Sequence, residues 1–369
     1  MIRAGSGFSS ITNVFRALEE AVGNAMVKCP NPQLFFVFSS SNYDPRLISE
    51  FFSSEFKNSW FIGTSSSGVI TETEESEWRK NSISLLALEA LPFVPFSIWT
   101  GNKDPEEIGR NLGIRLEKSA STSSSLVVLT TPMVDIQSVI DGVSKVLNIP
   151  IVGGLSSALP NDPLFVFSND SLGSYNICGV LMSVDVDISV FQTCRNVGDI
   201  YTITKVEGNA IEEIEGLSAF QIFQDTIRSV TSISPEFANV PWLVGVEVGE
   251  DIFRYTGIIG VNSGQIFTAQ PIPTGSRICF ATISKESAQM NSFSELYHLK
   301  KKKGEFGLFF NCIARGRNLY GVQNYDISTI VSCTGNIPIA GFFTNGEIAK
   351  VSDKNFLFYY TGVFALFYL

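Results

Sequence analysis

Residues 60–68 read Trp-Phe-Ile-Gly-Thr-Ser-Ser-Ser-Gly, a short apolar run that enters a turn rich in glycine and serine. An apolar run at 34–38 and an amphipathic stretch at 45–56 precede it. A continuous apolar run of this length is typical of a strand buried on both faces, and the amphipathic spacing is typical of a helix. Residues 34–68 therefore predict a unit of strand, helix, strand and glycine-rich turn.

The same order of elements occurs twice more. Residues 126–129, 136–147 and 149–152 predict strand, helix and strand before the turn Gly153-Gly154-Leu155-Ser156-Ser157. Residues 308–310, 327–333 and 337–340 do the same before the turn at 341–347. Further strands or hairpins are predicted after each copy, at 82–90, 178–184 and 357–369. We expect the three copies to superpose, with Gly63, Gly153 and Gly341 at equivalent positions.

The predicted fold class is α+β, with mixed, largely antiparallel sheets covered by helices and built from these repeated units of strand, helix, strand, glycine turn and hairpin. Outside the repeats, apolar spacing predicts helices over 10–27, 104–118 and 218–228, and short strands between 242 and 283. The N-terminal stretch with Gly5 and Gly7 lacks the third glycine of a dinucleotide-binding loop, so we discard that reading.

Composition excludes several classes of function. The chain has 369 residues, with 26 Lys and Arg against 36 Asp and Glu, a net charge of −10. This acidic balance argues against nucleic acid as a partner. The single histidine, His298, excludes a multi-histidine metal site. It also leaves Gly63-Thr64-Ser65-Ser66-Ser67-Gly68 without a histidine nearby, so we interpret that stretch as a turn rather than a nucleophile elbow.

The chain is predicted to be cytoplasmic. No apolar segment of a secretory signal follows Arg3. The longest uncharged apolar run, 356–369, is shorter than the roughly 20 residues that span a membrane, so we expect no membrane span. The six cysteines, at 29, 178, 194, 279, 312 and 333, are scattered and predict free thiols in a reducing compartment.

Cys312-Ile313-Ala314-Arg315-Gly316 follows a predicted buried strand, a position where α/β folds often bind ligands. We predict that Arg315 anchors an anionic group and that Cys312 lines the same pocket. Glu347 would hold Arg315 or meet an ammonium group of the ligand, which indicates an amino-acid-like ligand. A plain ion pair between Arg315 and Glu347 is the alternative. The predicted ligand-binding residues are Gly63, Ser65, Gly153, Gly154, Cys312, Arg315, Gly316, Gly341, Gly346 and Glu347.

Several stretches together resemble the FIST family, named for F-box and intracellular signal transduction proteins. They are residues 36–44, 62–70, 151–154, 201–209, 312–316 and 338–348. The resemblance implies an N-terminal FIST domain over 1–195 and a C-terminal one over 196–369. It implies a sensory or interaction module without established catalysis that binds a small metabolite, with amino acids proposed. We expect a separate signalling or ubiquitin-ligase-type partner, because no F-box is expected in a chain that begins in the first FIST helix.

Three alternatives stay open. One is a protein-interaction scaffold of the kind found in F-box proteins. A second is a haem-based nitric-oxide sensor; however, Tyr359-Tyr360-Thr361 stands where the family often has His-Asn before Thr, and His298 lies beside lysines. The third is an enzyme that uses Cys312 as nucleophile, which lacks a neighbouring histidine base. The main expectation is a non-catalytic sensor with no cofactor.

Overall fold

The computed structural model describes residues 2–78, 81–233 and 240–369. The chain forms two compact units. The first unit comprises Met1–Phe191, Ser292–Leu357 and Thr361–Leu369, and the second comprises Gln192–Asn291 and Phe358–Tyr360. The chain therefore leaves and re-enters the first unit twice. The sequence analysis expects a boundary between two FIST domains at 195/196. That boundary is a different matter from the division into compact units, and it stays a prediction.

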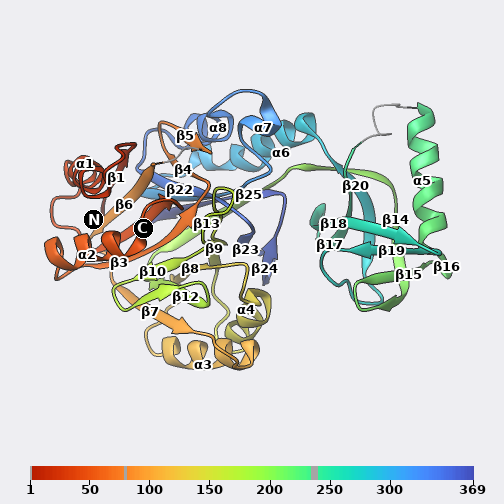
Figure 1. Ribbon diagram of the computed structural model, residues 1–369, viewed down its shortest axis with the longest axis horizontal. Coiled ribbons are helices and arrows are strands. Elements are labelled where there is room, and N and C mark those ends of the chain that lie inside the picture. Colours follow the sequence, from red (N-terminus) through yellow and green to blue (C-terminus); the bar gives the residue numbers. More distant parts are fainter. Residues whose placement is uncertain (1, 79–80, 234–239) are drawn as a thin grey trace. The chain divides into compact units, whose positions relative to one another are not determined.

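The first unit contains three mixed, six-stranded sheets of the same design (Figure 1). In strand order, the first is β1 (Arg3–Ser9), β6 (Ile83–Glu89), β2 (Leu34–Ser40), β3 (Trp60–Ser66), β10 (Val166–Ser168) and β11 (Ser171–Gly173). The second is β7 (Phe93–Trp99), β12 (Asn176–Met182), β8 (Ser125–Thr130), β9 (Ile151–Leu155), β23 (Glu347–Val351) and β24 (Lys354–Phe358). The third is β13 (Asp185–Gln192), β25 (Thr361–Tyr368), β21 (Phe306–Cys312), β22 (Ile339–Thr344), β4 (Gly68–Thr71) and β5 (Glu75–Glu77).

Each sheet is built around one predicted repeat. The central strands β2 and β3, β8 and β9, and β21 and β22 are parallel pairs, and each pair is joined through helices. The helices are α2 (Pro45–Glu55) in the first repeat, α4 (Ile136–Ser144) in the second, and α7 (Arg317–Tyr320) with α8 (Tyr325–Thr334) in the third. The α+β class expected from the sequence is confirmed.

Glycine occupies the same position in all three repeats, as predicted. Gly63 lies opposite Val37 in its parallel pair, Gly153 opposite Val128, and Gly341 opposite Phe309. A Cβ atom at any of them would lie 1.8–2.2 Å from the carbonyl oxygen of that partner. These glycines are therefore required by close backbone packing.

The three repeats exchange hairpins in a ring. The hairpin β4–β5, which follows the first repeat, pairs with β22 of the third. The hairpin β10–β11, which follows the second repeat, pairs with β3 of the first. The strand β23, which follows the third repeat, pairs with β9 of the second. Every sheet therefore contains strands from distant parts of the sequence.

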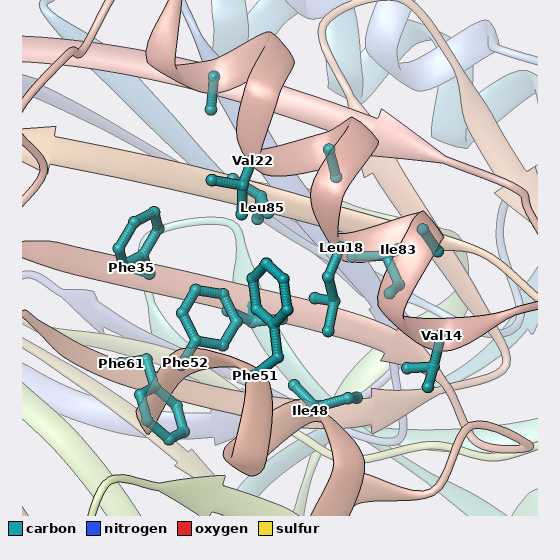
Figure 2. Packing of buried hydrophobic residues seen from close by; sticks show 14 of the residues in the cluster. Val14, Leu18, Val22, Phe35, Ile48, Phe51, Phe52, Phe61, Ile83 and Leu85 are labelled. Atoms are coloured by element: carbon teal, nitrogen blue, oxygen red, sulfur yellow. The ribbon is translucent and has the colours of Figure 1, made fainter. Parts of the chain in front are cut away.

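Helices α1 (Val14–Met26) and α2 cover the first sheet with apolar side chains (Figure 2). Val14, Leu18 and Val22 recur every four residues along α1 and form one buried face. The N-terminal cap of α1 is Asn13, whose side chain accepts a hydrogen bond from the Arg16 amide.

The segment before α1 is a strand, β1, which the sequence analysis left as an irregular stretch. Gly5 and Gly7 let β1 approach α1, because a Cβ at either position would lie within 2.0 Å of the Ala25 or Ala21 carbonyl oxygen. The helices α3 (Pro105–Glu117) and α4 pack against one another in the same unit. Asp104, the first residue of the helix predicted over 104–118, is the N-terminal cap of α3.

In its described residues the second unit is a seven-stranded antiparallel sheet against which helix α5 (Ala219–Ile233) packs. In order, its strands are β14 (Cys194–Glu207), β20 (Arg277–Ile283), β17 (Trp242–Gly249), β18 (Ile252–Asn262), β19 (Gln265–Thr268), β15 (Ala210–Ile214) and β16 (Leu217–Ser218). The Phe223 ring of α5 lies 4.9 Å from that of Phe280 in the sheet. Helix α6 (Lys285–Tyr297) and a 3-10 turn (His298–Lys301) lead back into the first unit.

Candidate functional site

The three glycine-rich turns lie against one another inside the first unit. The Ser66 and Ser157 hydroxyl groups both donate to the Phe343 carbonyl oxygen, the former at 3.0 Å. The Leu155 amide donates to the Gly346 carbonyl oxygen at 2.9 Å, and the Asn345 amide returns a bond to Leu155. The three turns therefore form a buried hydrogen-bond network with one another.

The predicted glycines and serine of this region have structural partners. Gly154 lies against the Thr344 methyl group and the Phe342 ring, so a Cβ there would overlap both. The Ser65 hydroxyl accepts a hydrogen bond from the Phe165 amide at 3.1 Å. Gly316 has a positive φ of 66° and lies against the Glu77 carboxylate. A ligand-binding role for these residues stays a prediction.

Arg315 is fully buried, and its guanidinium group is surrounded by partners. It forms a bidentate pair with Asp326, at 3.1 Å from Nε to Oδ2 and 2.8 Å from Nη2 to Oδ1. Tyr320 and Asn311 also donate to Asp326, at 2.9 and 3.0 Å. Burial by itself lowers the pKa of Arg315, but the charge of Asp326, the neighbouring Tyr320 and the hydrogen bonds to Asp326 together raise it above its usual value, so the group is a permanent cation.

The ion pair recorded for Arg315 is therefore with Asp326 and not, as one sequence interpretation had it, with Glu347. Asp326 supplies from within the chain an anionic group of the kind that the sequence analysis expects Arg315 to anchor. Spacing suggested Glu347 because that residue follows a glycine turn. Asp326 was missed because it lies in the first turn of α8, where an acid is also expected at the surface of a helix.

Glu347 is also fully buried, on β23. Its carboxyl group accepts hydrogen bonds from the Thr344 hydroxyl group and, at 2.7 Å, from the Thr361 hydroxyl group. Burial raises its pKa to about 8, although the bonds from the two threonines act in the opposite direction. Glu347 pairs with Gly154, the residue that follows the repeat glycine of its sheet. In the other two sheets the residues that pair in the same way are valines, Val69 and Val166.

Arg315 and Glu347 both bind the chain where it crosses between the compact units. Arg315 Nη1 donates to the Phe191 carbonyl oxygen at 3.2 Å, and Nη2 donates to the Ser292 hydroxyl group at 2.8 Å. Phe191 and Ser292 are the first-unit residues on either side of the segment 192–291. Thr361, which Glu347 holds, is where the chain re-enters after 358–360. Arg315 thus holds both ends of the first excursion, and Glu347 holds the end of the second at which the chain returns.

Cys312 lies on β21 beside Thr344 of β22 and is 6% exposed. Its carbonyl oxygen accepts a hydrogen bond from the Arg315 amide at 2.9 Å, so the two predicted residues do lie together. All six cysteines are free and buried, as expected. Burial raises the pKa of Cys29, Cys178 and Cys279 to about 12, which makes these thiols poor nucleophiles.

Within the described part of the chain, no cluster of three or more His, Cys, Asp or Glu side chains could hold a metal ion. His298 Nε2 lies 3.6 Å from Asp187 Oδ2 and is about half exposed. None of the helices described is long and apolar enough to cross a membrane.

The second unit contains a pocket that the sequence analysis did not predict. It has an empty volume of about 400 Å³, its open mouth included. Its lining comes from the hairpin β17–β18 and from the segment 270–273, which the sequence shows only as a proline-punctuated stretch between strands. The lining residues are Val246, Arg254, Tyr255, Thr256, Gln270, Pro271, Ile272, Pro273 and Tyr359.

Comparison with known families identifies the class of protein. A profile of the FIST N domain matches residues 33–217, and one of the FIST C domain matches residues 219–350. The chain belongs to the FIST family, whose domains are sensory domains of signal transduction. The resemblance noted in the sequence is confirmed.

Individual relatives carry no functional description. An uncharacterized protein of Mycobacterium tuberculosis (strain CDC 1551 / Oshkosh) is 27% identical over 234 residues, which are 59% of this chain and 60% of the relative. An uncharacterized protein of Mycobacterium bovis (strain ATCC BAA-935 / AF2122/97) is 27% identical over 190 residues, 48% of this chain and 49% of the relative. The matches thus span about half to three fifths of the length of these curated relatives.

Proposed function

We propose that this chain is a non-catalytic, intracellular sensory module that binds a small metabolite, with amino-acid-like compounds as the first candidates, and signals through a separate partner protein. The observation that carries the proposal is the set of contacts that Arg315 makes. A buried cation whose partners include Phe191 and Ser292 ties the connections of the second unit into the core of the first. A binding event that moves residues 192–291 would act on that core through these connections.

The chemistry of the site supports a sensor rather than an enzyme. Arg315 and Glu347 form hydrogen bonds with groups of the protein itself, and both side chains are fully buried. The thiol of Cys312 is buried, and its segment carries no histidine that would act as a base. We propose that Arg315, Cys312 and Glu347 transmit a signal and do not transform a substrate.

A thermal-shift screen of metabolites, amino acids included, tests the proposal. A ligand present at about 100 times its dissociation constant stabilises the folded chain by about 2.7 kcal/mol, a measurable shift in the melting temperature. A screen in which no metabolite shifts the transition contradicts the sensory proposal and favours a scaffold. A Soret band in the purified protein would favour the haem alternative instead. Turnover of a bound compound that is lost on Cys312→Ser would favour the enzyme.

A further inference from the structure

The first unit has a groove that is lined by residues of helices α1 and α2 and by Phe56, the residue that follows α2. The groove has an empty volume of about 600 Å³, its open mouth included. Three phenylalanines, two glutamates and a serine line it, namely Phe15, Glu19, Phe51, Ser54, Glu55 and Phe56. None of them belongs to the buried hydrogen-bond network of Arg315 and Glu347, and the sequence analysis did not predict this groove.

The aromatic side chains of the groove form one continuous group. The Phe15 ring of α1 lies 6.4 Å from the Phe51 ring of α2, and the Phe51 ring lies 6.2 Å from that of Phe56. Phe51 is buried in the core and points from α2 toward α1 (Figure 2), whereas Phe15 and Phe56 are only partly buried. Phe15 and Phe56 therefore keep ring surface that can cover methylene groups of a ligand, and the face of such a ring also attracts an ammonium group.

The charge of the lining is negative. Glu19 and Glu55 are exposed, and within residues 2–78, 81–233 and 240–369 neither carboxylate forms a hydrogen bond or an ion pair. None of the described lining residues is a lysine, arginine or histidine. The Ser54 hydroxyl group donates to the Phe51 carbonyl oxygen at 3.0 Å. A ligand carboxylate would therefore meet only like charge here, whereas ammonium groups would meet two carboxylates.

The two carboxylates favour a ligand with two positive charges. A single exposed ion pair contributes little to binding, because water competes for both groups and salt screens them. When one short chain joins two ammonium groups, the second ion pair forms without a further loss of translational freedom. The chain itself is removed from water where it lies on Phe15 and Phe56.

We propose that this groove binds a small aliphatic diamine, whose ammonium groups pair with Glu19 and Glu55 and whose methylene chain covers the phenylalanine rings. The ligand needs no carboxylate. This inference deepens the proposed sensory function, and it rests on that function for the claim that the diamine is the metabolite sensed.

Isothermal titration calorimetry of the full chain at low salt with 1,5-diaminopentane, L-lysine and pentylamine tests the ligand class. The three compounds share one carbon chain, to which lysine adds a carboxylate and from which pentylamine lacks an ammonium group. We expect the diamine to bind, and lysine to bind about tenfold more weakly because its carboxylate meets like charge. Pentylamine should bind about two- to fivefold more weakly than the diamine, since it forms one ion pair instead of two.

Glu19→Gln and Glu55→Gln should each weaken binding of the diamine by about two- to fivefold, and the double variant by about tenfold. Both side chains are exposed, so the amides should leave the folded chain intact. The matched control is Glu50→Gln. Glu50 is also an exposed glutamate of α2, and its replacement removes the same charge from the chain, but it does not line the groove.

The proposal is overturned if 1,5-diaminopentane does not bind at millimolar concentration, or if lysine or pentylamine binds as tightly. It is also overturned if Glu50→Gln weakens binding as much as Glu55→Gln, which would indicate attraction to the acidic chain as a whole. A screened metabolite that stabilises wild type and the double variant equally would overturn the groove as the sensory site and leave the sensory function standing. Diamine binding that leaves amide hydrogen exchange over 192–291 unchanged would support the groove and contradict the sensing role.

Discussion

Arg315 shows how burial changes what a charged residue contributes to stability. At a surface, an ion pair contributes little to stability, whereas breaking a fully buried pair leaves an uncompensated charge. Asp326 depends on Arg315 for two of its hydrogen bonds, and both residues are fully buried. The small effect that a partly exposed pair would show is therefore not expected here.

Arg315→Lys should lower the free energy of unfolding by about 3–5 kcal/mol, because an ammonium group cannot reproduce the bidentate bond and the contacts with Phe191 and Ser292 together. Urea denaturation measures the loss. The control is Arg317→Lys, two residues away, whose side chain is exposed and should change stability by less than about 0.5 kcal/mol. Equal stability of the two variants would contradict the clamping role of Arg315.

Glu347 should make stability depend on pH. The folded chain keeps this group protonated up to about pH 8, whereas the unfolded chain loses the proton above about 4.5. The unfolded state therefore binds fewer protons between these values, and stability falls as pH rises through that window. A shift of this size corresponds to a loss on the order of 5 kcal/mol.

Unfolding free energies of wild type and Glu347→Gln, measured from pH 5 to pH 8.5, isolate this effect. The amide keeps the shape of a protonated carboxyl group but does not titrate, so the variant should show a flatter profile and be the more stable of the two at high pH. Glu75, which burial and the charge of Asp326 also shift upward in pKa, remains in both proteins and cancels in the difference. Parallel profiles would show that Glu347 does not titrate in this window.

At the scale of elements, the repeat glycines are determined by the sheet rather than by a ligand. Gly341→Ala should destabilise the chain by about 3 kcal/mol, because the new Cβ would lie 2.1 Å from the Phe309 carbonyl oxygen, and a central strand has little room to move. Gly23→Ala is the control. Gly23 lies within α1 with nothing within 4 Å of an added Cβ, so alanine there should stabilise by about 0.5–1 kcal/mol. Thermal melts of both variants measure the contrast.

The elements that the sequence predicted well are those buried on both faces. Strands such as β2 and β21 read as unbroken apolar runs, and their helices show clear spacing, so the three repeats were visible without a structure. Strand β1 was missed because Gly5 and Gly7, which make room for α1, also typify loops. The ion pair of Asp326 and the pocket beside Arg254 were missed for a related reason. Each is built from segments of the sequence that no local pattern connects.

At the scale of the molecule, the exchanged hairpins make the N-terminal half incomplete. The predicted domain 1–195 contains the hairpin β4–β5 but not its partner β22, and it contains β9 but not β23. We therefore expect a fragment of residues 1–195 to lack a cooperative thermal transition and to bind a hydrophobic dye, whereas the full chain melts cooperatively. A fragment that melts cooperatively and shows dispersed amide resonances would contradict this and support an independent domain.

The ring of exchanged hairpins also bears on how the protein is made. Ile70 of β4 pairs with Gly341 of β22, so the first hairpin to leave the ribosome waits for roughly 270 further residues before its partner strand exists. At about 5–20 residues per second, that wait is roughly 15–50 seconds. During translation β4 and β5 have an unpaired edge, the kind of surface that other nascent chains join. We therefore expect the pairing that closes the finished sheet to leave the growing chain prone to aggregation until β22 has been synthesised.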